Sequence, residues 1–68
     1  MQLSIMVNGS RMEVPQGTSI AQLLQLLEIG KGPMAVEKNL QIIKKTDYDR
    51  TLIEESDQIE IVHFVGGG

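Results

Sequence analysis

Three glycines, Gly66, Gly67 and Gly68, end the sequence directly after an apolar segment. Glycine has no Cβ, so a tail of this kind fits a channel too narrow for side chains and adopts either sign of φ there. A C-terminal carboxylate on Gly68 is ionised at neutral pH, because α-carboxyl groups titrate near ~3.5. The tail is therefore a candidate for chemical activation at Gly68, with Gly66 and Gly67 as a slender stem. The alternatives are a frayed chain end or an expression remnant, and the other residues must decide between them.

The remaining composition supplies no catalytic set. The 68 residues include no Cys and one His, which excludes a thiolate nucleophile, a disulfide framework and sulfur ligands for a metal. A domain of this size hides only about 60% of its unfolded surface, so it has little room for an enclosed active site. We expect the protein to have no bound metal and no catalytic activity of its own.

Charge and hydropathy restrict the partners. Nine acidic residues against six basic ones give a net charge of -3, whereas nucleic-acid binders concentrate Lys and Arg. No segment approaches the ~20 apolar residues of a membrane span, and the first residues do not have the pattern of a secretion signal. We expect a cytoplasmic protein that binds neither nucleic acid nor membrane.

The first part of the chain predicts a hairpin followed by a helix. Residues 2–7 have the period of a half-buried strand, with Leu3, Ile5 and Val7 on one side and Gln2, Ser4 and Met6 on the other. Asn8-Gly9 favours a type I′ turn, so residues 10–14 should return as a second strand. Ser19 and Gln22 have the spacing of a capping box, which predicts a helix from Ile20. Its apolar stripe comprises Ile20, Leu23, Leu24 and Leu27, and we expect Gly30 to end it in a left-handed conformation.

The second part predicts three more strands. Residues 34–39 and 40–44 are predicted as strands separated by a tight reversal, and residues 45–50 as a 3₁₀ turn around Tyr48. Leu52 and Ile53 are interpreted as a small apolar plug, residues 54–57 as a polar turn, and residues 58–65 as the last strand. A helix with one apolar stripe must cover a sheet with one apolar face. The predicted fold is α+β, a β-grasp with a mixed four- to five-stranded sheet wrapped around one helix; residues 1–65 form the domain and 66–68 the tail.

Alternation along the last strand predicts a docking surface. If Ile59 and Ile61 face the helix, the even-numbered residues beside them face away. Exposed apolar side chains often mark partner surfaces, although scattered ones are normal and Phe64 could instead fold over the sheet edge. Glu60 also belongs to an acidic cluster with Glu54, Glu55 and Asp57, either a solvated turn or a complement to a basic partner. The predicted partner-binding residues are Met6, Glu60, Val62 and Phe64.

Several motifs together resemble one known family. They are Val7-Asn8-Gly9, the segment Ala35-Val36-Glu37 with Asn39, and a run from Asp57 to Val62 that leads to Gly67-Gly68. Across essentially all 68 positions the chain resembles the ThiS sulfur carriers of thiamine biosynthesis, which are ubiquitin-like β-grasp proteins. One departure is Ser56, where the family usually has Gly before the Asp, and this departure concerns the geometry of the turn.

The resemblance implies a function for the tail. A ThiF-type adenylating enzyme would use ATP and magnesium to convert Gly68 to an acyl-adenylate. A persulfide donor, such as a cysteine desulfurase, would then supply sulfur and leave a thiocarboxylate. A ThiG-type thiazole synthase would take that sulfur into the thiazole ring. The alternatives are a carrier like the small subunit of molybdopterin synthase, a covalent protein modifier that forms an isopeptide bond, and a non-covalent β-grasp interaction module.

Overall fold

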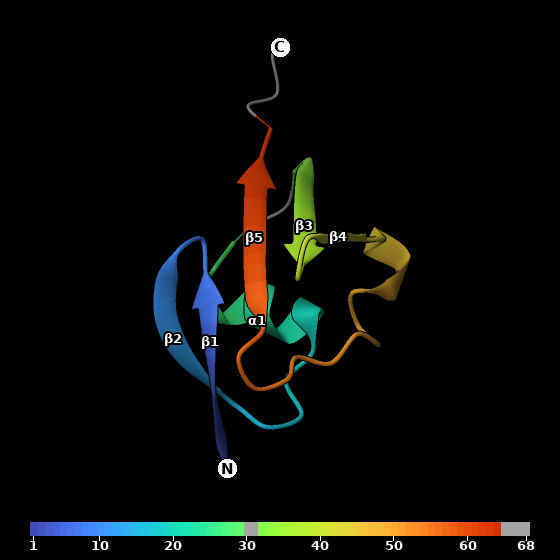
Figure 1. The fold of residues 1–68 in the computed structure, drawn as a ribbon. Coiled ribbons are helices and arrows are strands. Elements are labelled where there is room, and N and C mark those ends of the chain that lie inside the picture. Colours follow the sequence, from blue (N-terminus) through green and yellow to red (C-terminus); the bar gives the residue numbers. More distant parts are fainter. Residues whose placement is uncertain (30–31, 65–68) are drawn as a thin grey trace.

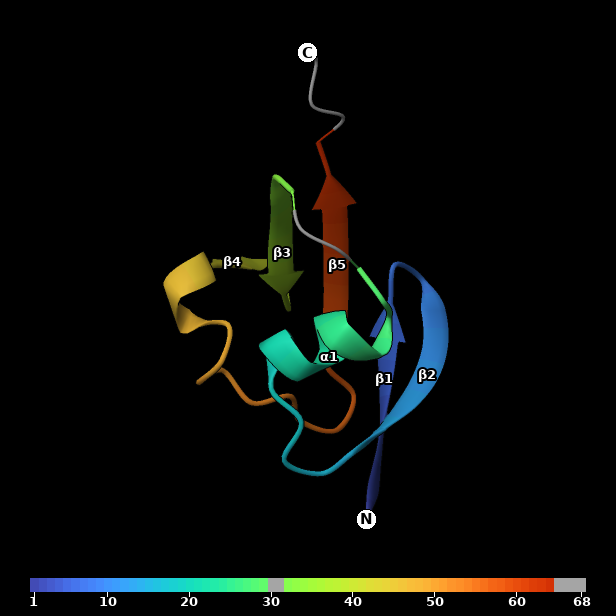
Figure 2. The ribbon, with the colours of Figure 1, turned by 180° about the vertical axis from the view of Figure 1, so that it is seen from behind.

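Residues 1–29 and 32–64 are described by the structure, a computed structural model. In these residues five strands form a mixed sheet in the order β2-β1-β5-β3-β4, and one helix, α1, covers one face of it (Figures 1 and 2). The central strands β1 and β5 run parallel, and every other neighbouring pair is antiparallel. The elements are β1 (Gln2–Val7), β2 (Ser10–Pro15), α1 (Ile20–Leu26), β3 (Met34–Lys38), β4 (Gln41–Ile43), a 3₁₀ turn η1 (Lys45–Asp47) and β5 (Gln58–His63). The β-grasp prediction is thereby confirmed, with five strands.

The core lies between α1 and the inner face of the sheet. Inward-facing residues of four strands pack against the apolar stripe of the helix, as the alternation in the sequence predicts. Tyr48 and Ile53 close the core beside η1, whereas Leu52 is 54% exposed, so the predicted apolar plug consists of Ile53 alone. The buried apolar residues are Ile5, Val7, Val14, Ile20, Leu23, Leu24, Val36, Tyr48, Ile53, Ile59 and Ile61.

Helix α1 begins as its sequence predicts. The Ser19 hydroxyl accepts a hydrogen bond from the Gln22 backbone N–H at 3.1 Å, and the Ser19 backbone N–H donates to the Gln22 side-chain oxygen at 3.0 Å. This reciprocal pair is the predicted capping box, and it satisfies two N–H groups that no helical carbonyl can reach. The buried Ile20 follows as the first helical residue.

The end of α1 differs from the prediction. The helix ends at Leu26, and Glu28 takes the left-handed conformation with φ of 55°. The Glu28 N–H donates to the Gln25 carbonyl and the Ile29 N–H to the Leu24 carbonyl, which is the hydrogen-bond pattern of a Schellman motif. The prediction of Gly30 as the left-handed residue was wrong, because Glu28 has that role; Gly30 itself lies outside the described residues.

Both hairpins turn through left-handed residues. Asn8 and Gly9 have φ of 49° and 82°, as the predicted type I′ turn requires. The β3–β4 turn repeats this conformation at Asn39 and Leu40, with φ of 52° and 70°. Leu40 therefore belongs to the turn, and the predicted strand over residues 40–44 is shortened to β4.

Replacing Ser56 with glycine is expected to raise the free energy of unfolding by about 0.5–1 kcal/mol, or roughly 4 °C in Tm. Ser56 has φ of 70°, a conformation that costs an L-residue energy and glycine very little. Its backbone N–H donates to the Ser4 carbonyl at 2.8 Å, a bond that glycine retains. Thermal unfolding measures the gain. Ser56→Ala is the control, since it removes the hydroxyl but keeps the strain; equal gains in both variants would refute the explanation.

Candidate functional site

The outer face is defined as the side of the sheet away from α1, and this side is turned toward the viewer in Figure 1. The alternation and exposure of β1 and β5 place the predicted docking residues on it. Along β5, Ile59 and Ile61 are 1% and 8% exposed and belong to the core, as predicted. Val62 is 52% exposed and Phe64 is 55% exposed. The Phe64 N–H donates to the Pro33 carbonyl at 3.1 Å, so pairing with β3 continues past the end of β5 and Phe64 keeps the parity of Val62.

The strand register separates Met6 from the other apolar residues. Met6 pairs with Gln58 at the beginning of β5, whereas Val62 pairs with Ala35 of β3 near its end. Four residues of extended chain span about 13 Å, so Met6 and Val62 do not adjoin along the sheet. The predicted apolar surface is therefore divided, with Val62 and Phe64 at the end from which the tail continues.

Glu37 is an outer-face residue that the sequence reasoning did not single out. It lies directly opposite Glu60 in the β3–β5 register, and Ile42 of β4 lies opposite Glu37 on its other side. Like charges in direct cross-strand pairs repel each other and lower the stability of the fold. A cation from a partner that binds between Glu37 and Glu60 would reduce this repulsion. The two carboxylates also offer acceptors for an Arg or Lys side chain. We define the outer-face patch as Glu37, Glu60, Val62 and Phe64.

Asp57 does not belong to a solvated acidic surface. The residue is 5% exposed, and its carboxylate accepts hydrogen bonds from the Glu54 backbone N–H at 2.8 Å and from Asn39 Nδ2 at 3.0 Å. Lys38 Nζ lies 3.4 Å from the same carboxylate. The prediction of an acidic cluster that includes Asp57 was wrong, because Asp57 holds the turn and the β3–β4 hairpin together. Glu54 and Glu55 remain exposed at that turn.

The tail residues Gly66, Gly67 and Gly68 lie outside the described residues, so their roles remain predictions. Phe64, a member of the outer-face patch, is the last described residue, and it directly follows the last residue of β5. Within residues 1–29 and 32–64, no group of three His, Cys, Asp or Glu side chains could hold a metal ion. The described part of the chain also has no helix with the length and apolar character needed to cross a membrane.

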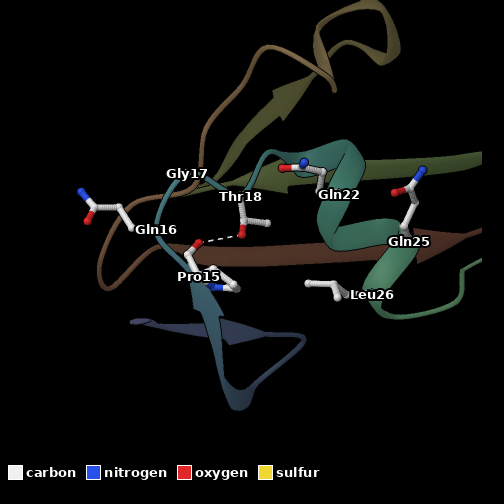
Figure 3. A pocket seen from close by; sticks show the side chains of 7 residues that line it. All are labelled: Pro15, Gln16, Gly17, Thr18, Gln22, Gln25 and Leu26. Atoms are coloured by element: carbon white, nitrogen blue, oxygen red, sulfur yellow. Dashed lines mark hydrogen bonds between the residues drawn. The ribbon is translucent and has the colours of Figure 1, made fainter. Parts of the chain in front are cut away.

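A separate groove of about 460 Å³ lies where the loop after β2 meets α1 (Figure 3). The Thr18 hydroxyl points to the Pro15 carbonyl and donates to it at 2.6 Å, so its hydrogen is already used (Figure 3). The Gln22 side-chain oxygen accepts the Ser19 N–H in the capping box. The lining comprises Pro15, Gln16, Gly17, Thr18, Gln22, Gln25 and Leu26, a set without a charged group or a strong nucleophile. This groove gives no chemical reason to place the functional site there.

In residues 1–29 and 32–64, a five-stranded mixed sheet with β1 and β5 parallel at its centre wraps one helix, and this arrangement defines a ubiquitin-like β-grasp protein. The model of the ThiS family matches residues 5–68. The chain belongs to the ThiS family.

Individual relatives agree with this assignment. The chain is 37% identical to the sulfur carrier protein ThiS of Bacillus subtilis (strain 168), over 94% of this chain and 98% of that protein. It is also 36% identical to a thiazole synthase of Magnetococcus marinus over 97% of this chain, and it spans about a fifth (20%) of that protein's length. The crystal structure of the thiamine biosynthesis protein ThiS from Geobacter metallireducens has a TM-score of 0.78 at 26% identity and covers 97% of this chain and 100% of that one.

Proposed function

We propose that this chain is a sulfur carrier of thiamine biosynthesis that acts in the cytoplasm and bears sulfur as a thiocarboxylate on Gly68. The similarity over nearly the full length of the Bacillus subtilis sulfur carrier is the observation that carries the proposal. The match to the ThiS family and the likeness to a solved thiamine biosynthesis protein favour the thiamine pathway over molybdopterin as the acceptor of the sulfur. The chain then serves as a protein cosubstrate, and its partners supply the catalytic groups.

The proposed chemistry begins with activation of a poor electrophile. A ThiF-type enzyme with ATP and magnesium joins the Gly68 carboxylate to AMP and releases pyrophosphate. The terminal sulfur of a protein persulfide attacks the acyl carbon, AMP leaves, and an acyl disulfide forms. A second thiol then reduces the S–S bond, which leaves a thiocarboxylate on Gly68 and a disulfide between the two thiols. The absence of Cys from the chain confines the carried sulfur to its terminus.

The outer-face patch is proposed to dock these partners. Val62 and Phe64 supply exposed apolar area at the end of β5, and an aromatic side chain is a frequent contributor to binding energy. Glu37 and Glu60 supply negative charge beside it, which would complement a basic partner surface and speed association. The proposed partners are the adenylating enzyme, a cysteine desulfurase or similar persulfide donor, and a ThiG-type thiazole synthase. The likeness to a segment of a Magnetococcus marinus thiazole synthase supports the last of these.

Intact-mass spectrometry tests the proposal. The protein is incubated with an adenylating enzyme of this family, ATP, magnesium, a cysteine desulfurase with cysteine, and a thiol reductant. We expect the mass to increase by the difference between one sulfur and one oxygen atom, and fragmentation to place the change on Gly68. Omission of the sulfur donor should instead let the acyl-adenylate accumulate. Absence of both products, with an enzyme that loads a known carrier in parallel, would refute the proposal.

A further inference from the structure

Asn8 pairs with β5 through its side chain at the point where β1 ends. The last residue of β1, Val7, lies opposite Ile59, while β5 continues for several residues. The Asn8 backbone N–H donates to the Ile59 carbonyl at 2.9 Å. Its side chain then takes the next position: Nδ2 donates to the Ile61 carbonyl at 3.1 Å, and Oδ1 accepts from the Ile61 N–H at 2.7 Å. A primary amide has the donor and acceptor of a peptide unit, so Asn8 adds one rung to the parallel ladder.

Asparagine meets two requirements at this position. Its φ of 49° directs the backbone into the β1–β2 turn, away from β5, and Asn is among the few non-glycine residues that tolerate this region. The side chain remains beside β5 and pairs with both backbone groups of Ile61. Aspartate would lose the donor, and glycine would keep the turn but lose the whole rung.

Asn39 is a counterpart at the opposite end of β5. It has a similar φ of 52°, its N–H donates to the Gln58 carbonyl at 2.8 Å, and its Oδ1 accepts from the Gln58 N–H at 3.0 Å. Asn39 approaches from the β3 side, at the first residue of β5, and also donates to the buried Asp57. The two asparagines thus hold β5 from opposite sides, and only Asn8 acts near the end that continues toward Gly68.

We infer that Asn8 is a positioning residue that fixes the direction in which the chain leaves β5. Ile61 is the last buried residue of this strand, and Val62, His63 and Phe64 after it are exposed. Without the Asn8 amide, the described end of β5 is held through the β3 side alone, where Phe64 bonds to Pro33. Its functional consequence rests on the proposed function: a tail that must enter a partner's active site starts where Phe64 leaves the sheet, so the direction of the chain at Phe64 affects productive entry.

Asn8→Gly and Asn39→Gly form a matched pair, because both keep a left-handed turn and both remove amide bonds to β5. We expect Asn8→Gly to raise hydrogen exchange at the Ile61 and Phe64 amides about tenfold, and to lower kcat/KM for adenylation about tenfold, since small errors in placement are costly in rate. Asn39→Gly should lower Tm more than Asn8→Gly does, because it also removes the hydrogen bond to Asp57. When kcat/KM is corrected for the folded fraction, however, Asn39→Gly should stay within about twofold of the wild-type protein.

The outcomes of these experiments distinguish a failure of the inference about Asn8 from a failure of the proposed function. Equal losses of kcat/KM in the two variants, or a loss that follows Tm, would mean that Asn8 is only structural and would overturn the inference. If the adenylating enzyme does not act on the wild-type protein, the proposed function fails. The exchange data then decide about Asn8 alone: unchanged protection of Ile61 and Phe64 in Asn8→Gly contradicts the inference, and a loss confined to that end of β5 supports it.

Discussion

Replacing Asp57 with alanine is expected to lower the free energy of unfolding by about 3–5 kcal/mol, because it removes one partner of a buried ion pair and two hydrogen-bond acceptors at once. The carboxylate bonds to the Glu54 N–H and the Asn39 side chain, and Lys38 Nζ lies 3.4 Å away with its side chain 20% exposed. Domains of this length have a stability of roughly 3–10 kcal/mol, so a loss of this size removes a large share of it. Urea unfolding followed by circular dichroism measures the change.

Asp47 offers a control for the Asp57 prediction. It too is paired with a basic residue, Arg50, at 3.2 Å, but both side chains are open to solvent, at 43% and 74% exposed. Exposed pairs of this kind are worth about 0–1 kcal/mol, so Asp47→Ala should change stability little. The loss of stability in Asp57→Asn should lie between those of Asp57→Ala and Asp47→Ala, because asparagine keeps an acceptor but loses the charge opposite Lys38. If Asp57→Ala and Asp47→Ala unfold at the same urea concentration, the buried network does not stabilise the fold as described.

The elements that the sequence predicted are those set by local rules. Asn8-Gly9 determines a two-residue hairpin, Ser19 with Gln22 determines a helix start, and strict alternation in β5 determines which residues face outward. Each rule acts within a few residues, so no knowledge of distant partners is needed. The outward positions of Val62 and Phe64 could be predicted for that reason.

The features that the sequence did not predict depend on contacts between distant segments or on conformations that residue type disfavours. Glutamate rarely adopts the left-handed conformation, whereas glycine adopts it readily. Residue preference alone therefore favoured the nearby Gly30 over Glu28 as the left-handed residue that ends α1. The burial of Asp57 depends on Asn39, 18 positions away, which a polar turn does not reveal. The opposition of Glu37 and Glu60 follows from the β3–β5 register, and alternation within each strand does not specify that register.

Removing Gly67 and Gly68 is expected to abolish sulfur loading altogether while leaving the fold unchanged. Loading ends because the shortened chain places its carboxylate two residues, or roughly 7 Å, short of the proposed reaction site. Stability should be retained because, in the part of the chain that the structure describes, no core residue follows Ile61. Intact-mass spectrometry after incubation with the adenylating enzyme and sulfur donor measures loading, and thermal unfolding measures stability. Full loading of the truncated chain would contradict a function for the tail. A non-covalent interaction module would instead keep its function after Gly67 and Gly68 are removed.

Phe64→Lys is the reciprocal control, because it changes the outer-face patch and leaves Gly68 in place. Its wild-type side chain is 55% exposed, so Tm should change little, whereas the Kd for the adenylating enzyme should rise about tenfold or more through loss of an aromatic contact. Raising the enzyme concentration should then restore loading of Phe64→Lys but never that of the truncated chain. This difference separates docking from chemistry: the patch determines how often the carrier is bound, and the tail determines whether a bound carrier can react. A large fall in Tm for Phe64→Lys would instead assign Phe64 to the core.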